Sequence, residues 1–122
     1  MAWLFLLLAG LLEVAWATGL KAAAKHPRYW PMILVFIVSI GSFLCLARAM
    51  KDLPLGTTYV IWTGIGAVGA ALCGMWFYKE SPDPWRLAFM ALVVIGIVGL
   101  KLNTRDTPPL EFDISSPPAA KP

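Results

Sequence analysis

Four long apolar segments take up most of this chain and restrict what it can fold into. Each is about 16 to 23 residues long, and an α-helix of about 20 residues crosses the hydrocarbon core of a bilayer. The hydrophobic fraction of 59% and the charged fraction of 14% also depart from those of a soluble domain. The sequence therefore predicts an all-α membrane protein with four transmembrane helices, at Ala2–Leu20, Trp30–Ala49, Gly56–Tyr78 and Trp85–Leu100.

The links between these segments are short, which predicts that successive helices are antiparallel neighbours. The fourth segment is the shortest and would rely on Arg86 or Lys101 reaching the membrane surface. Residues 1–102 are expected to form one transmembrane transporter domain. Residues 103–122 are rich in proline and mixed in charge, and we predict a disordered polar tail there.

Several classes of function lack their motifs in this sequence. There is no phosphate-binding loop, nucleophile elbow or dinucleotide fingerprint, so we expect neither an enzyme nor a cofactor. Cys45 and Cys73 do not have metal-site spacing, so no metal is expected. The basic residues lie at segment ends rather than along one stripe, which argues against nucleic acid as a partner. No basic residue precedes the first segment, and Glu13 interrupts it, so a cleaved signal peptide is not expected.

Glu13 is the only ionisable side chain within the first apolar segment, and it lies near the middle. A carboxylate at that depth costs roughly 2.5–3.5 kcal/mol on insertion scales, so it is expected to have a function. Residues three and four positions away share its helical face, and they include Gly10 and Trp16. Because most residues on this face are small, we expect Glu13 to lie between helices, at an ion or substrate site.

Other segments supply candidate neighbours for this carboxylate. On the third segment, Tyr59, Trp62, Thr63 and Gly66 share one face. The glycines there indicate either close helix packing or a bend that changes between two states. Ser42 lies in the middle of the second segment. It is either a serine bonded to the backbone of its own helix or a hydrogen-bond partner of Glu13.

One chain with a single membrane carboxylate can enclose little of a pathway, so a homodimer is predicted. Two Glu13 side chains would then share a central site that holds either protons or an organic cation. Nearby aromatic rings would favour the cation. On the fourth segment, Gly96 and Gly99 form a small-residue edge suited to a dimer contact. Lys101 is more typical of an anchor at the membrane edge.

The basic residues are almost evenly divided between the two sides of a four-helix arrangement. One side has Arg48, Lys51, Lys101, Arg105 and the distant Lys121, and the other has Lys21, Lys25, Arg28, Lys79 and Arg86. Orientation depends on such an asymmetry, and this chain has almost none. We therefore expect insertion in both orientations, which permits an antiparallel, dual-topology homodimer. The alternative is that a weak bias, or the lipid, fixes a single orientation.

These residues together resemble the small multidrug resistance family. The similarity runs from Met1 to about Leu102 and includes Glu13 with Trp16, Leu53-Pro54-Leu55-Gly56-Thr57, Tyr59 and Ile61-Trp62-Thr63-Gly64-Ile65-Gly66. The resemblance implies a proton-coupled antiporter in the bacterial inner membrane that works by alternating access. It also implies that Glu13 is the shared proton and substrate site, that Tyr59 and Trp62 line this site, and that the last helix is a dimer contact.

Within that family the chain is similar to the guanidinium exporter subtype. The residues that carry this similarity are Trp16, Ser42, the run from Trp62 to Gly66, and Lys101. The implied partners are guanidinium, protons, membrane lipid and a second copy of the chain. One alternative is an exporter of quaternary ammonium and other drug cations. A second is a non-transporting scaffold or accessory subunit of a larger complex, and a third is a heterodimer with a paralogous chain.

Overall fold

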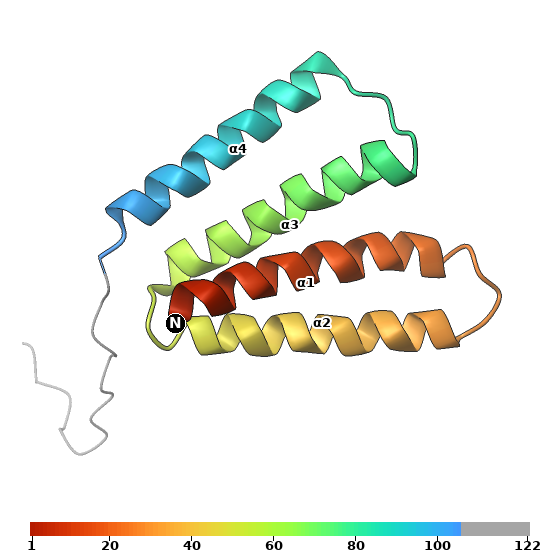
Figure 1. Ribbon diagram of the computed structural model, residues 1–122, viewed down its shortest axis with the longest axis horizontal. Coiled ribbons are helices and arrows are strands. Elements are labelled where there is room, and N and C mark those ends of the chain that lie inside the picture. Colours follow the sequence, from red (N-terminus) through yellow and green to blue (C-terminus); the bar gives the residue numbers. More distant parts are fainter. Residues whose placement is uncertain (106–122) are drawn as a thin grey trace, which may run out of the picture.

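The computed structural model describes residues 1–105, which form four helices (Figure 1). All four helices are long and apolar enough to cross a membrane, which confirms the all-helical prediction. The predicted tail lies outside the described residues from position 106 onward, and Asn103 is the last residue of the fourth helix. The helices are α1 (Ala2–Ala23), α2 (Trp30–Ala49), α3 (Leu55–Phe77) and α4 (Pro84–Asn103).

The helix boundaries follow local backbone chemistry. Pro54 has an extended backbone at the N-cap of α3, where a proline cannot continue a preceding helix. At α4, the Asp83 carboxylate accepts a hydrogen bond of 3.1 Å from the backbone N–H of Trp85. Pro84 is then the first helical residue, where its missing N–H would have had no partner inside the helix.

The helices do not contribute equally to packing. α1 packs against both α2 and α3, whereas α4 packs along α3 (Figure 1). Because successive helices run in opposite directions, Met1, the link at residues 50–54 and Asn103 lie at one end of the bundle. We call this the core end. The links at residues 24–29 and 78–83 lie at the opposite end, which we call the turn end.

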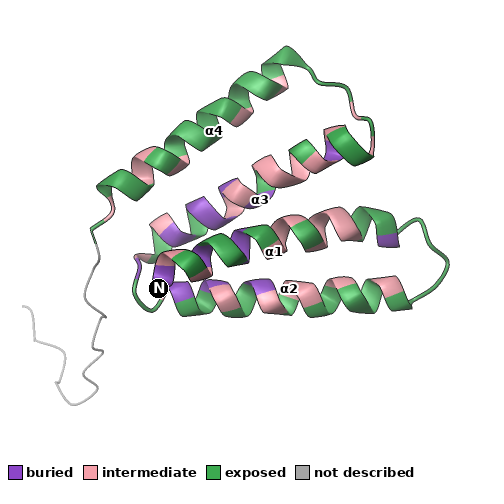
Figure 2. Ribbon diagram, in the orientation of Figure 1, coloured by how far each residue is buried: buried purple, intermediate pink, exposed green. Residues whose placement is uncertain are grey.

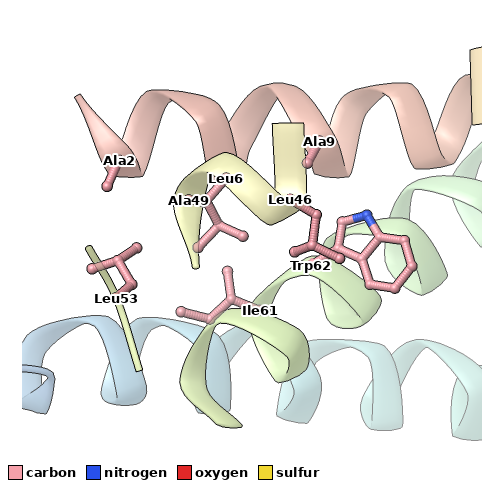
Figure 3. Close-up of a cluster of buried hydrophobic side chains, with 8 residues drawn as sticks. All are labelled: Ala2, Leu6, Ala9, Leu46, Ala49, Leu53, Ile61 and Trp62. Carbon is pink, nitrogen blue, oxygen red and sulfur yellow. The ribbon is translucent and has the colours of Figure 1, made fainter. Parts of the chain in front are cut away.

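The buried apolar side chains are concentrated at the core end (Figure 2). Leu6 is 1% exposed and Ala9 is fully buried, and Ile61 and Trp62 of α3 pack in the same cluster (Figure 3). Toward the turn end, α1 and α3 border an apolar groove of about 490 Å³, and a smaller pocket of about 280 Å³ lies at the core end between α1, α3 and α4. The buried apolar cluster at the core end consists of Ala2, Leu6, Ala9, Leu46, Ala49, Leu53, Ile61 and Trp62.

Helix α4 has no buried residue within this single chain. Most of α4 is exposed, as Figure 2 shows, although Ile97 and Leu100 are partly buried against the apolar cluster. A Cβ added at Gly96 or at Gly99 would meet no other atom within 4 Å. Exposed apolar surface of this extent needs lipid or a second protein surface to cover it.

Candidate functional site: a carboxylate between two helices

Glu13 projects from α1 against α3, where Gly66 makes room for it. A Cβ added at Gly66 would overlap Cγ of Glu13, so any larger residue must displace the carboxylate side chain. Gly10 provides the same kind of space on α1, because an added Cβ would lie 2.7 Å from Cγ2 of Ile65. α3 continues as one helix from Leu55 to Phe77. In this conformation, therefore, the glycines of α3 allow close helix packing and do not interrupt the helix.

The carboxylate of Glu13 is oriented by Trp16. The indole Nε1–H of Trp16 donates to Oε2 of Glu13 over 2.6 Å. The two residues are three positions apart on α1 and therefore lie on the same face of the helix. A donor to a charged oxygen makes a strong hydrogen bond, which fixes one carboxylate oxygen and leaves the other to interact elsewhere.

A second hydrogen-bonded chain joins three helices one turn from Glu13. The Nε1–H of Trp62 donates to Oγ of Ser42 over 3.2 Å, and the Ser42 hydroxyl donates to the carbonyl of Ala9 over 2.8 Å. Ala9 precedes Glu13 by four residues, so its carbonyl is also the regular helical acceptor for the Glu13 backbone N–H. The buried chain therefore fixes α2 and α3 on the turn of α1 that carries the carboxylate.

This arrangement differs from the first interpretation of Ser42 offered by the sequence. The hydroxyl donates to the backbone of α1 rather than to the backbone of its own helix. It also lies near the Glu13 carboxylate, so its role as a hydrogen-bond partner of Glu13 stays a prediction. A backbone carbonyl on another helix has no signature in the sequence. The position of Ser42 near the site is therefore predictable, but its acceptor on α1 is not.

Aromatic rings form a wall beside the buried chain. The ring of Trp62 lies 5.5 Å from that of Tyr59 and 5.6 Å from that of Phe43, measured between centroids. Trp62 is only 5% exposed, whereas Tyr59 is 51% exposed. Phe43 is not among the residues predicted for the site, because its only signal in the sequence is its position next to Ser42. Within residues 1–105, no hydrogen bond joins Tyr59 to Glu13.

The remaining predicted site residues lie farther from the carboxylate. The Thr63 hydroxyl donates to the carbonyls of Tyr59 and Val60 in its own helix. Lys101 lies at the core end, where its Nζ is 5.5 Å from the centroid of the Trp3 ring. The structure thus brings Glu13, Trp16 and Gly66 into direct contact. Ser42 and Trp62 are attached to them through Ala9, while Thr63 and Lys101 serve other contacts.

This arrangement, a carboxylate within four apolar helices, occurs in a chain whose residues 1–93 match the family model described as Small Multidrug Resistance protein. The chain belongs to this family. It is a multi-pass membrane protein with four spans, and a transporter rather than an enzyme.

Relatives in enteric bacteria cover most of the chain. A protein named guanidinium exporter from Escherichia coli K12 is 53% identical over 104 residues, which is 85% of this chain and 99% of the relative. Proteins of the same name from Citrobacter freundii and Salmonella typhimurium are 51% identical over the same shares of both chains.

Chemically, the site offers one carboxylate, indole donors and apolar walls. Among residues 1–105, no group of three or more histidine, cysteine or acidic side chains is arranged to hold a metal ion. A carboxylate in such surroundings can accept a proton, or it can accept hydrogen bonds from a small organic cation.

Proposed function

We propose that this chain exports guanidinium across the bacterial inner membrane in exchange for protons. The observation that carries the proposal is the Glu13 carboxylate, held between α1 and α3 with one oxygen bound by Trp16. The relatives named guanidinium exporters support the choice of substrate. On this account Glu13 binds either protons or the cation, and each displaces the other.

Guanidinium suits this carboxylate because of its shape and charge. The ion is planar and permanently charged, and it presents pairs of N–H donors that match the two oxygens of a carboxylate. Trp16 holds Glu13 in one orientation, and the bonds among Trp62, Ser42 and Ala9 hold the surrounding helices. A rigid carboxylate of this kind favours a small ligand that also forms directed hydrogen bonds.

The proposal includes an antiparallel homodimer. One chain leaves α4 without a buried residue and leaves Gly96 and Gly99 facing open space, as a packing surface for a second copy would. Two Glu13 side chains would then share one central site. Exchange of conformation between the subunits would open that site to opposite sides of the membrane in turn, giving alternating access.

Reconstitution into liposomes tests this function. An imposed guanidinium gradient should drive protons in the opposite direction with the wild-type protein. Glu13→Gln should abolish this movement while leaving the dimer intact, because the substitution keeps the size of the side chain but removes its charge. A scaffold would behave differently, since Glu13→Gln would disturb assembly and the wild type would move no protons in response to guanidinium.

A second candidate substrate class is the larger quaternary ammonium cation. The observation in its favour is the apolar groove of about 490 Å³ beside α1, which begins at Val14, next to Glu13. Such a groove could hold an apolar substituent. In the same liposomes, proton movement driven better by a large quaternary ammonium than by guanidinium would favour this alternative.

A further inference from the structure

A cluster of polar side chains joins the turn between α3 and α4 to the C-terminal part of α1. One carboxylate oxygen of Glu80, in that turn, lies 2.6 Å from Nζ of Lys21 in the last turns of α1. The other oxygen lies 2.9 Å from Nη2 of Arg86, in the first turn of α4. A single acidic residue therefore connects three helices at the turn end of the bundle.

Tyr78 strengthens the same connection. Its hydroxyl donates to the backbone carbonyl of Thr18 on α1 over 3.1 Å. The Nζ of Lys21 lies 4.4 Å from the centroid of its ring, within the range of a cation–π contact. Lys79, between Tyr78 and Glu80, has a φ of 51°, in the left-handed region. This reversal allows Glu80 to fold back over Gly74, whose carbonyl accepts its backbone N–H over 3.3 Å.

The cluster stands at one end of the apolar groove between α1 and α3. The groove extends from Val14, the neighbour of Glu13, to Tyr78 and Ala22. At the core end, in contrast, the same two helices are held together by the buried apolar cluster around Leu6 and Ile61 (Figure 3). The seam between α1 and α3 is thus closed by apolar packing at one end and by polar contacts at the other.

The polar contacts at the turn end and the apolar packing at the core end differ in the free energy needed to break them. The side chains of Lys21, Glu80 and Arg86 are 47%, 32% and 38% exposed. Partly exposed ion pairs of this kind can exchange their partners for water with little change in free energy. Separating the apolar cluster would instead expose buried side chains such as Leu6 and Trp62. By this comparison, parting α1 from α3 would cost less at the turn end than at the core end.

We propose that Lys21, Tyr78, Glu80 and Arg86 form a latch that closes the groove toward Glu13 at the turn end and opens during transport. This inference rests on the proposed alternating-access function. In an antiparallel dimer, each side of the membrane has the turn end of one subunit and the core end of the other. Each exchange of conformation would open the latch of one subunit and close that of its partner.

Glu80→Gln tests the latch in the full-length dimer. The substitution removes the charge that both cations share but leaves the distribution of Lys and Arg between the two sides, which sets orientation, unchanged. We expect proton leak into liposomes without guanidinium to rise several-fold and the guanidinium moved per proton to fall. The affinity for guanidinium should stay within about twofold, because Glu13 and Trp16 are untouched.

The matched control is Asp52→Asn at the core end. It removes an exposed ion pair of 2.9 Å with Arg48, but that pair joins residues only four positions apart. Proton leak and coupling should match those of the wild type. The latch is overturned if Glu80→Gln leaves leak and coupling at wild-type values, or if Asp52→Asn changes them equally. Wild-type liposomes that show no guanidinium-driven proton movement would instead overturn the proposed function.

A reversible cross-link provides a second measurement. Cysteines replace Lys21 and Glu80 in a background of Cys45→Ala and Cys73→Ala, and a short bis-thiosulfonate joins them within each subunit. A locked latch should reduce guanidinium flux to the level of Glu13→Gln while preserving guanidinium binding, and a reductant should restore flux. Undiminished flux in fully cross-linked protein would contradict the proposal.

Discussion

At the scale of single residues, the contacts of Glu13 explain how a carboxylate can occupy a membrane span. Trp16 supplies a hydrogen bond to one oxygen, and Gly66 lets the side chain lie against α3 instead of pointing into lipid. The same contacts restrict the positions the carboxylate can take. The site therefore depends as much on the absence of a side chain at Gly66 as on the acid itself.

Gly66→Ala should impair transport more than it impairs folding. The added methyl group would overlap Cγ of Glu13, and overpacking of this kind costs about 1–3 kcal/mol in stability. Moving Glu13 away from Trp16 should lower guanidinium flux at least tenfold. Liposome flux and unfolding in detergent would measure both effects. Gly56→Ala is the control, because its Cβ would meet nothing within 4 Å, and wild-type flux in Gly66→Ala would refute the packing argument.

Ser42→Ala should destabilise the bundle and weaken the site. It removes the acceptor of the Trp62 indole and the donor to Ala9, all within the buried region. Hydrogen bonds between helices in membranes contribute about 0.6 kcal/mol on average, with a maximum of about 1.7 kcal/mol, so a loss of about 1–2 kcal/mol is expected for the pair. Chemical unfolding in mixed detergent micelles would measure the loss.

Ser39→Ala is the matched control for that substitution. The Ser39 hydroxyl donates to the carbonyl of Phe36 within α2, so its removal breaks no contact between helices. Equal stabilities for the two variants would contradict the role assigned to Ser42.

At the scale of the helices, the sequence predicted number and placement well because hydrophobic length alone determines them. The structure extends α1 to Ala23 and α4 to Asn103, each three residues beyond the predicted segments. Contacts between helices were harder to foresee, because they depend on how the helices rotate against one another. The hydrogen bond from Ser42 to α1 and the ion pair between Glu80 and Lys21 are both contacts of this kind. Glu13 and Trp16 were predictable as a pair because they lie on one helix.

Gly96→Leu should weaken the dimer if α4 is the packing surface. A large side chain there would keep the backbones of two α4 helices apart. Within the single chain it would cause no steric clash at its Cβ, because a Cβ at Gly96 meets nothing within 4 Å. Cross-linking or sedimentation in detergent should show a larger monomer fraction. Val94→Leu enlarges a residue on another face of α4 and serves as the control. An unchanged monomer fraction in Gly96→Leu would exclude Gly96 from the contact.

The latch should also give the protein a specific acid sensitivity. The hydrogen bond from Lys21, followed by that from Arg86, lowers the pKa of the Glu80 carboxyl below its ordinary value. Lys79 and Asp83 lie in the same turn as Glu80, and Lys25 lies 5.2 Å from the centroid of the Tyr78 ring. A carboxyl with a depressed pKa stabilises the fold above the pKa it has when unfolded. That contribution is lost as the pH falls through the folded pKa.

Thermal unfolding of the wild type and Glu80→Gln would measure this effect. The difference between their midpoints should be constant above about pH 5 and shrink below about pH 4, given the ordinary glutamate pKa of about 4.3. A difference that grew on acidification would contradict the assigned ion pairs.

At the scale of the whole molecule, two properties fit the proposed pair of chains. The basic residues are balanced between the two sides, which permits both orientations, and a single chain leaves α4 uncovered. The ends of each chain also differ, with apolar packing at the core end and polar contacts at the turn end. In an antiparallel pair, each side of the membrane would have the core end of one chain and the turn end of the other. The pair could therefore open to either side in two equivalent states.

Proton release on substrate binding tests most directly whether Glu13 holds either protons or the cation. Guanidinium is added to the purified dimer in weakly buffered detergent solution near neutral pH, and the pH is followed. The account predicts acidification with the wild type and none with Glu13→Gln. Binding of guanidinium to the wild type without release of protons, at any pH between about 6 and 9, would contradict it.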